Sequence, residues 1–174
     1  MKRKVVILGA GGCGRNILEA IQAQAQTSAS LVHVNTHRES IIQSTIKDSV
    51  LLSQLDADHV CQMVDITPYE TVTLVAGLGG ATGTAVALAL AERANLMGKR
   101  INAVVTAPFD FEGKTRRNKA TSAIHRLEQF CDSVVLLDNN AYLNEGIEDG
   151  PASRLFDHVN SLAGIALLSC LENS

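Results

Sequence analysis

The hydrophobic and polar residues of the chain group into two kinds of segment. Short runs rich in Val, Ile and Leu are apolar at nearly every position, as strands buried on both faces of a sheet must be. Longer, helix-like segments lie between them. The apolar runs predict strands at Lys4–Leu8, Leu31–Asn35, Ser49–Ser53, Val72–Ala76, Ile101–Thr106 and Ser133–Leu137. The longer segments predict helices at about Arg15–Gln26, Asp56–Val64, Thr84–Leu96, Lys114–Phe130 and Ala152–Leu171, with Pro151 in the first turn of the last one.

This alternation of strands and helices predicts an α/β fold. We expect a doubly wound, mainly parallel, Rossmann-like sheet with helices on both sides, ending in a long helix. A chain of 174 residues has the length of one ordinary domain, so residues 1–174 are expected to form a single domain. Ligands of such sheets bind beyond the carboxyl ends of the strands, and the loops there are the first candidates for a site.

Composition narrows the range of functions. Hydrophobic residues make up 46% and charged residues 19%, which excludes disorder. The net charge of −3 excludes a globally basic, nucleic-acid-binding surface. Four well-separated cysteines indicate reduced thiols in a cytoplasmic protein, and the five histidines form no convincing metal-ligand set. The charge-free stretch Thr71–Ala91 is 21 residues long, but four Gly and four Thr interrupt it, so we expect no membrane span.

Eight of the 13 glycines fall in two short windows, each directly after a predicted strand. The windows are Gly9–Gly14 and Gly77–Gly83. Glycines let the backbone approach a ligand closely, and a helix that begins there presents unpaired N–H groups, so the two together form a phosphate cradle. Either loop alone could be a tight strand-to-helix turn. Two of them in one sheet predict a nucleotide site.

These residues alone leave more than one kind of nucleotide open. Gly9, Gly11 and Gly14 satisfy the dinucleotide pattern G-x-G-x-x-G, which expects an acidic residue about 20 residues later to hold a ribose. The second predicted strand, at whose end this acid is expected, runs into Val34-Asn35-Thr36-His37, with no acid until Glu39, although Arg38 could serve a 2′-phosphate. An NADP-binding Rossmann oxidoreductase therefore stays open as an alternative. A Walker P-loop is excluded, because no Gly-Lys-Ser/Thr follows either window.

Three loops carry a family resemblance. The segment Gly79-Gly-Ala-Thr-Gly-Thr84 resembles the signature G-G-G-T-G-T/S-G of the tubulin and FtsZ family of GTP-binding proteins. Gly11-Gly-Cys-Gly-Arg-Asn16 is similar to the first phosphate loop of that family. Val104-Val-Thr-Ala-Pro-Phe-Asp-Phe-Glu-Gly-Lys-Thr-Arg116 is similar to the FtsZ segment V-V-T-x-P-F-x-F-E-G-x-x-R. The resemblance is closer to FtsZ than to tubulin, covers nearly the whole chain and is weakest between Ile41 and Glu70.

The resemblance implies a guanine nucleotide, GTP or GDP, with Mg²⁺ alongside GTP. The residues that it places around the phosphates are Gly11, Gly12, Cys13, Gly14, Arg15, Asn16, Gly79, Gly80, Ala81, Thr82 and Gly83. Glu112 would accept hydrogen bonds from the ribose hydroxyls, and Arg116 would approach the phosphates. Asn139 would read the guanine edge. Phe156 would stack on the base and Asn160 would bond to it, since residues four apart share one helix face.

Some positions depart from the family pattern. His37 stands where the family motif N-T-D has Asp. No glycine-rich third loop is found between Ser44 and Glu70, and whether one of Asp56, Asp58 and Asp65 in this segment substitutes for it stays open. The sequence ends at Ser174, before the acidic loop with which the family positions the attacking water, so we expect no self-sufficient hydrolysis.

Because of these departures, we expect the protein to act together with a second protein. We expect a guanine-nucleotide-binding protein that acts with a filament-forming, cell-division-type partner, either a full-length FtsZ-like protein or a second copy bound through the nucleotide face. A nucleotide-free interaction scaffold is the other alternative. Around the site, Arg117 and Lys119 are interpreted as a solvated helix face. Cys13 lies in the phosphate loop near a helix start, a place that can lower the pKa of a thiol, but a Cys at such a place more often fills a small space.

Overall fold

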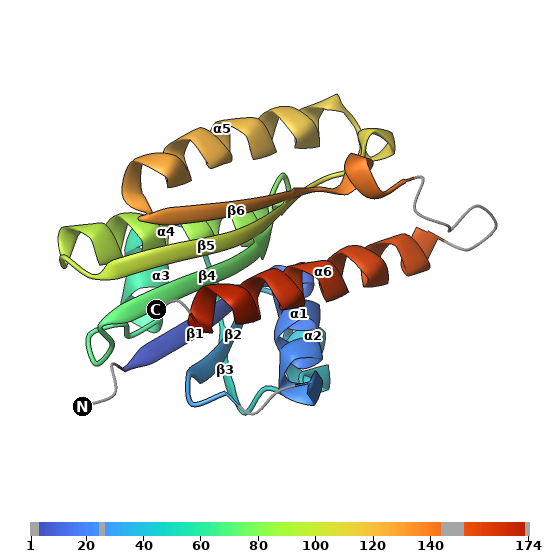
Figure 1. Cartoon of the computed structure of the whole chain (residues 1–174). Coiled ribbons are helices and arrows are strands. Elements are labelled where there is room, and N and C mark those ends of the chain that lie inside the picture. Colours follow the sequence, from blue (N-terminus) through green and yellow to red (C-terminus); the bar gives the residue numbers. More distant parts are fainter. Residues whose placement is uncertain (1–3, 25–26, 144–151, 173–174) are drawn as a thin grey trace.

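A computed structural model describes residues 4–24, 27–143 and 152–172. Its six strands form one all-parallel sheet in the order β3-β2-β1-β4-β5-β6 (Figure 1). The strands are β1 (Val5–Ala10), β2 (Ser30–Asn35), β3 (Asp48–Leu51), β4 (Thr71–Gly77), β5 (Arg100–Ala107) and β6 (Ser133–Asp138). The order reverses between β1 and β4, and this reversal is the switch point at which doubly wound sheets bind their ligands.

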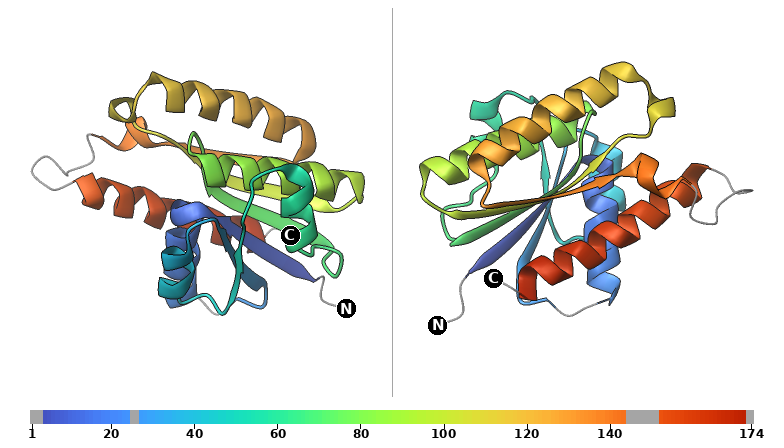
Figure 2. Two further views of the ribbon diagram at one scale, coloured as in Figure 1. Left: turned by 180° about the vertical axis from the view of Figure 1, so that it is seen from behind. Right: turned by 45° about the horizontal axis from the view of Figure 1, so that its top comes forward.

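Helices cover both faces of the sheet (Figures 1 and 2). The helices are α1 (Gly11–Gln24), α2 (Arg38–Gln43), α3 (Ala57–Met63), α4 (Ala81–Leu96), α5 (Lys114–Phe130) and α6 (Ala152–Glu172), with the 3₁₀ turns η1 (Asp110–Glu112) and η2 (Asn139–Tyr142). One hydrophobic cluster joins α1 and α6 to one face of the sheet, and another joins α3, α4 and α5 to the opposite face. Successive β1 residues alternate between them, with Val6 and Leu8 in one cluster and Ile7 in the other. Burial on both faces explains the continuous apolar strands.

The predicted fold class is confirmed, and every predicted strand and helix is present within a few residues of its expected place. The largest differences are at helix starts: α1 begins at Gly11 and α4 at Ala81, inside the glycine windows, where low helix propensity had argued against helix. The short helix α2 was missed, because it buries none of its residues and shows no apolar stripe. Pro151 lies outside the described residues.

Candidate functional site

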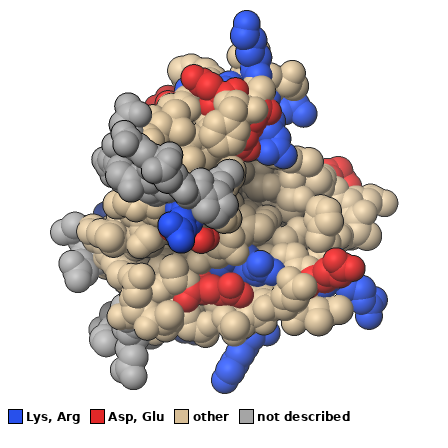
Figure 3. Space-filling model, turned by 90° about the vertical axis from the view of Figure 1, so that its right-hand side faces the viewer, with Lys and Arg blue, Asp and Glu red and all other residues tan. Residues whose placement is uncertain are grey.

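A cavity of about 570 Å³ opens where the strands end. Its volume is in the usual range for small-molecule sites. Figure 3 looks onto this end of the molecule, whose surface is hollowed near its centre and carries mostly uncharged residues around the hollow. The predicted site residues that line the cavity are Gly11, Gly12, Cys13, Asn16, Gly80, Ala81, Thr82, Gly83, Glu112, Arg116, Asn139, Phe156 and Asn160. The loops, α5 and α6 are therefore brought together at one site.

The two glycine windows place two helix starts at this cavity. β1 and β4 are neighbours in register, with Ala10 opposite Ala76, so the loops after them lie side by side. α1 begins at Gly11 immediately after β1, and Gly80 is the residue that precedes α4. The first N–H groups of a helix have no partner within it and carry a partial positive charge, which suits an anion.

The predicted residues Gly14, Arg15 and Gly79 are not among the lining residues. A Cβ at Gly14 would lie 2.6 Å from the carbonyl carbon of Gly9, so this glycine permits close packing of α1 on the sheet. Gly79 has a φ of +94°, and a Cβ there would lie 2.5 Å from the Arg116 carbonyl oxygen. Arg15 turns toward α2 and donates to the carbonyl oxygen of Ser40 at 3.3 Å. Gly14 and Gly79 thus allow close packing of the backbone, and Arg15 links α1 to α2; none of the three lines the cavity.

Aromatic rings and buried amides form one end of the cavity. Phe156 on α6 packs edge-on against the buried ring of Phe109, with 5.1 Å between their centroids, and remains 37% exposed. Asn139 at the end of β6 is 4% exposed and Asn160 on α6 is 8% exposed. The Asn139 Oδ1 atom is buried without a hydrogen-bond partner in the described part of the chain. A flat, partly exposed ring beside two amides is suited to a heteroaromatic base.

Glu112 is held firmly at the rim of the cavity. Its Oε1 accepts from the backbone N–H of Phe109 at 2.9 Å, and its Oε2 accepts from Arg116 at 2.8 Å. Arg116 itself is exposed. A fixed carboxylate of this kind can accept from sugar hydroxyls. The guanidinium would have to leave Glu112 in order to reach an anion deeper in the cavity.

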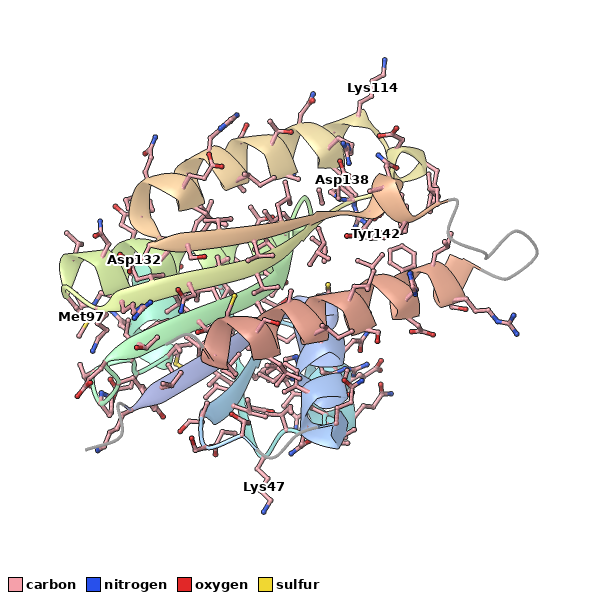
Figure 4. The ribbon with its side chains drawn as sticks, viewed as in Figure 1. Lys47, Met97, Lys114, Asp132, Asp138 and Tyr142 are labelled. Atoms are coloured by element: carbon pink, nitrogen blue, oxygen red, sulfur yellow. The ribbon has the colours of Figure 1, made fainter. Side chains whose placement is uncertain are left out.

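The interpretation of Arg117 as a solvated residue is wrong. Its guanidinium forms a two-pronged pair with Asp138, at 2.8 and 3.1 Å, and donates to the carbonyl oxygen of Pro108 at 2.7 Å. Asp138 also accepts from the backbone N–H of Asn140 and so begins the turn η2 (Figure 4). This pairing holds α5 against the end of β6 and positions Asn139, which follows Asp138 directly. The partners are too far apart in sequence for a local pattern to reveal them. Lys119 is exposed, as expected.

His37 lies at the end of the cavity near the glycine loops. Asn35 organises this turn: its Oδ1 accepts from the backbone N–H of Thr36 at 2.8 Å and of His37 at 3.2 Å. The hydroxyls of Thr36 and Thr82 are 2.9 Å apart, which ties the turn to the start of α4. Asn35 and Thr106 line the cavity but were missed, although a polar residue at the end of a buried strand is a readable signal.

The three acidic residues considered as substitutes for the third loop do not line this cavity. Asp56 caps α3 by accepting from the backbone N–H of His59 at 2.9 Å. Asp65 accepts from the backbone N–H of Thr67 at 2.8 Å. Asp58 lies in the first turn of α3 and is exposed. Asp56 and Asp65 thus serve local backbone structure.

Cys13 does not have the lowered pKa that a helix start can give a thiol. Burial raises the pKa of its thiol, a hydrogen bond with Thr106 opposes this, and the charge of Glu112 adds to it. The Sγ atom lies 3.6 Å from Thr106 Oγ1 and donates to Asn160 Oδ1 at 3.4 Å. The thiol is therefore a neutral hydrogen-bonding group and not an activated nucleophile.

The described lining residues do not supply a carboxylate for Mg²⁺. Glu112 is the one acidic residue among them, and its charge is already paired with that of Arg116 at 2.8 Å. Within residues 4–24, 27–143 and 152–172 no cluster of His, Cys, Asp and Glu is arranged to hold a metal ion. In the same ranges no helix combines the length and apolar character needed to cross a membrane.

Fold and cavity together define a doubly wound α/β domain with two glycine loops at its switch point. The model of the Tubulin/FtsZ family, GTPase domain, matches residues 52–146, and the chain belongs to this family. Cell division protein FtsZ 1 of Methanocaldococcus jannaschii is 28% identical over 156 residues, which are 79% of this chain and 43% of that protein. The chain thus spans less than half the length of this curated relative.

Solved structures agree with the family assignment. The structure titled FtsZ dimer, empty, from M. jannaschii has a TM-score of 0.83 at 26% identity, over 96% of this chain and 54% of that one. A CetZ from Methanosaeta thermophila has a TM-score of 0.76 at 19% identity, over 98% of this chain and 54% of that one, and at this identity shows the fold alone.

Proposed function

We propose that this chain binds a guanine nucleotide, GTP or GDP, in the cavity at the switch point. The observation that carries the proposal is the pairing of two helix starts with two buried amides in one cavity. The helix starts and their glycine loops bind the phosphates, Glu112 accepts from the ribose, and Phe156 stacks on the base beside Asn139 and Asn160. Family membership supports guanine as the base.

Calorimetry with GDP, ADP and NADP tests this proposal. We expect GDP to bind more tightly than ADP, and Asn160→Ala to weaken GDP by roughly 1–3 kcal/mol, because a buried polar group of the ligand loses its partner. Asn95→Ala on an exposed position of α4 is the matched control and should leave the affinity unchanged. Equal affinity for ADP and GDP would sink the assignment of guanine.

The same experiment separates the two alternatives. An NADP-linked enzyme would bind NADP in preference to GDP, and Arg38, its expected 2′-phosphate ligand, is not among the lining residues. A nucleotide-free scaffold would release no nucleotide when the purified protein is denatured, and would give no heat with any of the three ligands.

We further propose that the nucleotide face associates with a second protein of this family. M. jannaschii FtsZ has been solved as a dimer, which supports self-association or pairing with an FtsZ-like protein as the kind of contact to test. Light scattering of a full-length FtsZ with increasing amounts of this chain is the measurement. Unchanged assembly at equimolar ratio would contradict an interaction. Three expectations stay predictions: that the chain alone hydrolyses GTP negligibly, that Mg²⁺ accompanies bound GTP, and that the protein is cytoplasmic.

A further inference from the structure

The orientation of the two buried side-chain amides, Asn139 and Asn160, decides what the cavity can recognise. A side-chain amide has an accepting oxygen and a donating NH₂ group, so its rotation by half a turn reverses what it can recognise. Asn139 and Asn160 approach the cavity from different elements, the turn η2 and the helix α6. Whatever fixes these amides therefore decides which edge of a base fits between them.

Cys13 fixes one of them. Its thiol donates to Asn160 Oδ1 at 3.4 Å, and its sulfur lies 3.6 Å from the hydroxyl of Thr106, which can donate to it in turn. The donors then point one way, from Thr106 through Cys13 to Asn160. Gly77 leaves room for this arrangement, because a Cβ there would lie 2.9 Å from the Cβ of Cys13. With its oxygen engaged, Asn160 presents its NH₂ group to the cavity.

Asn139 has an acceptor without a partner. Its Oδ1 is buried and makes no hydrogen bond in the described part of the chain, although Asn139 itself lines the cavity. A buried acceptor without a partner is costly, and a turn of this side chain when a ligand binds would let a ligand N–H satisfy it. The matching base edge has an acceptor facing Asn160 and an N–H donor facing Asn139. Guanine has this combination in its O6 and N2 groups.

We propose that Cys13 is a positioning residue which holds the amide of Asn160 in one orientation and thereby sets the preference for a 6-oxo over a 6-amino purine. The proposal rests on the proposed function and deepens it. In adenine, an amino group replaces O6, and it would face the NH₂ of Asn160 donor to donor. Without the thiol the amide is free to turn, and its oxygen can then accept from the adenine amino group.

The test compares the GDP and ADP affinities of Cys13→Ala and Cys13→Ser with those of the wild type by calorimetry. Cys13→Ala should reduce the preference for GDP over ADP by about 3- to 10-fold, the range for one lost hydrogen bond. Cys13→Ser should keep the preference, because a hydroxyl donates at least as well as a thiol. Cys61→Ala, a cysteine outside the cavity lining, is the matched control and should keep it too.

The ratio of affinities separates positioning from packing. If Cys13 merely fills space, Cys13→Ala weakens GDP and ADP by the same factor, and this result overturns the proposal while leaving guanine binding intact. Should Cys13→Ala fail to fold, Thr106→Val removes the hydroxyl that supports the thiol, and we expect it to reduce the ratio in the same direction. A wild type that binds neither GDP nor ADP would overturn the proposed function itself.

Discussion

Gly80 offers a substitution that separates ligand binding from folding. Nothing in the described structure lies within 4 Å of a Cβ built at Gly80, and its φ of −81° is allowed for any residue. The Cβ of a leucine at this position therefore has open space, at a residue that lines the cavity. We expect Gly80→Leu to change the free energy of unfolding by less than about 1 kcal/mol, since a lost glycine also reduces the entropy of the unfolded chain.

The cost to binding is much larger. A phosphate held at this loop accepts from backbone N–H groups at the start of α4, and each hydrogen bond to a charged group is worth about 1.5–3 kcal/mol. A leucine that blocks two of them removes roughly 3–6 kcal/mol, which corresponds to a loss of GDP affinity of at least about 100-fold.

Titration calorimetry with GDP measures the affinity, and thermal unfolding followed by circular dichroism verifies that the variant is folded. Gln62→Leu is the matched control, because it adds the same side chain at an exposed position of α3 outside the cavity lining. A folded Gly80→Leu protein that binds GDP within threefold of the wild type would refute the assignment of this loop to the phosphates.

Two further substitutions test the supporting structure. Gly14→Ala places a Cβ 2.6 Å from the backbone of Gly9, so urea unfolding should show that the free energy of unfolding falls by about 1–3 kcal/mol. Gly12→Ala, whose Cβ meets nothing within 4 Å, is the control and should show no loss. Equal stability of the two variants would contradict this reasoning. Arg117→Met should lower the free energy of unfolding by about 1–2 kcal/mol near pH 7. This value is already reduced because the Arg117 and Asp138 side chains are 30% and 40% exposed. Arg126→Met, at an exposed position of α5, is the control. The hydrogen bond from Arg117 holds the pKa of Asp138 below its ordinary value. The stabilisation is therefore complete above about pH 4 and is lost as the pH falls through the lower pKa of the folded state. A difference in unfolding free energy between wild type and Arg117→Met that stays constant from about pH 7 to pH 2 would be inconsistent with the pair.

Local patterns were sufficient to predict the strands, the glycine loops and most of the cavity lining. The apolar runs of the central strands β1, β4 and β5 are buried on both faces, and each window follows a strand, so the relevant signal lies within a few neighbouring residues. Local sequence patterns were insufficient for residues whose contact partner lies far away in the sequence. Arg117 and Asp138 are 21 positions apart and Cys13 and Asn160 are 147 apart, and only the folded chain brings these pairs together.

The environment of Cys13 shows why a local rule about helix starts does not decide the state of a thiol. A helix start favours a thiolate, and Cys13 does lie near the start of α1. Burial favours the neutral thiol and raises its pKa, and α6 brings Asn160 to the sulfur. The position of α6 over this loop follows from tertiary packing, which the first 20 residues do not encode by themselves.

The glycines of the two windows bear on whether the cavity holds a ligand at all. A Cβ would meet other atoms of the protein within 3 Å at Gly9, Gly14, Gly77, Gly79 and Gly83, and Gly11 has a φ of +71°, so the fold itself accounts for these six. Gly12 and Gly80 have neither constraint, yet both line the cavity. A scaffold without a ligand has no physical need for a bare backbone at these two positions, whereas an anion that binds directly to backbone N–H groups does. The two glycines that the fold does not require are therefore the ones that favour a phosphate ligand over an empty site.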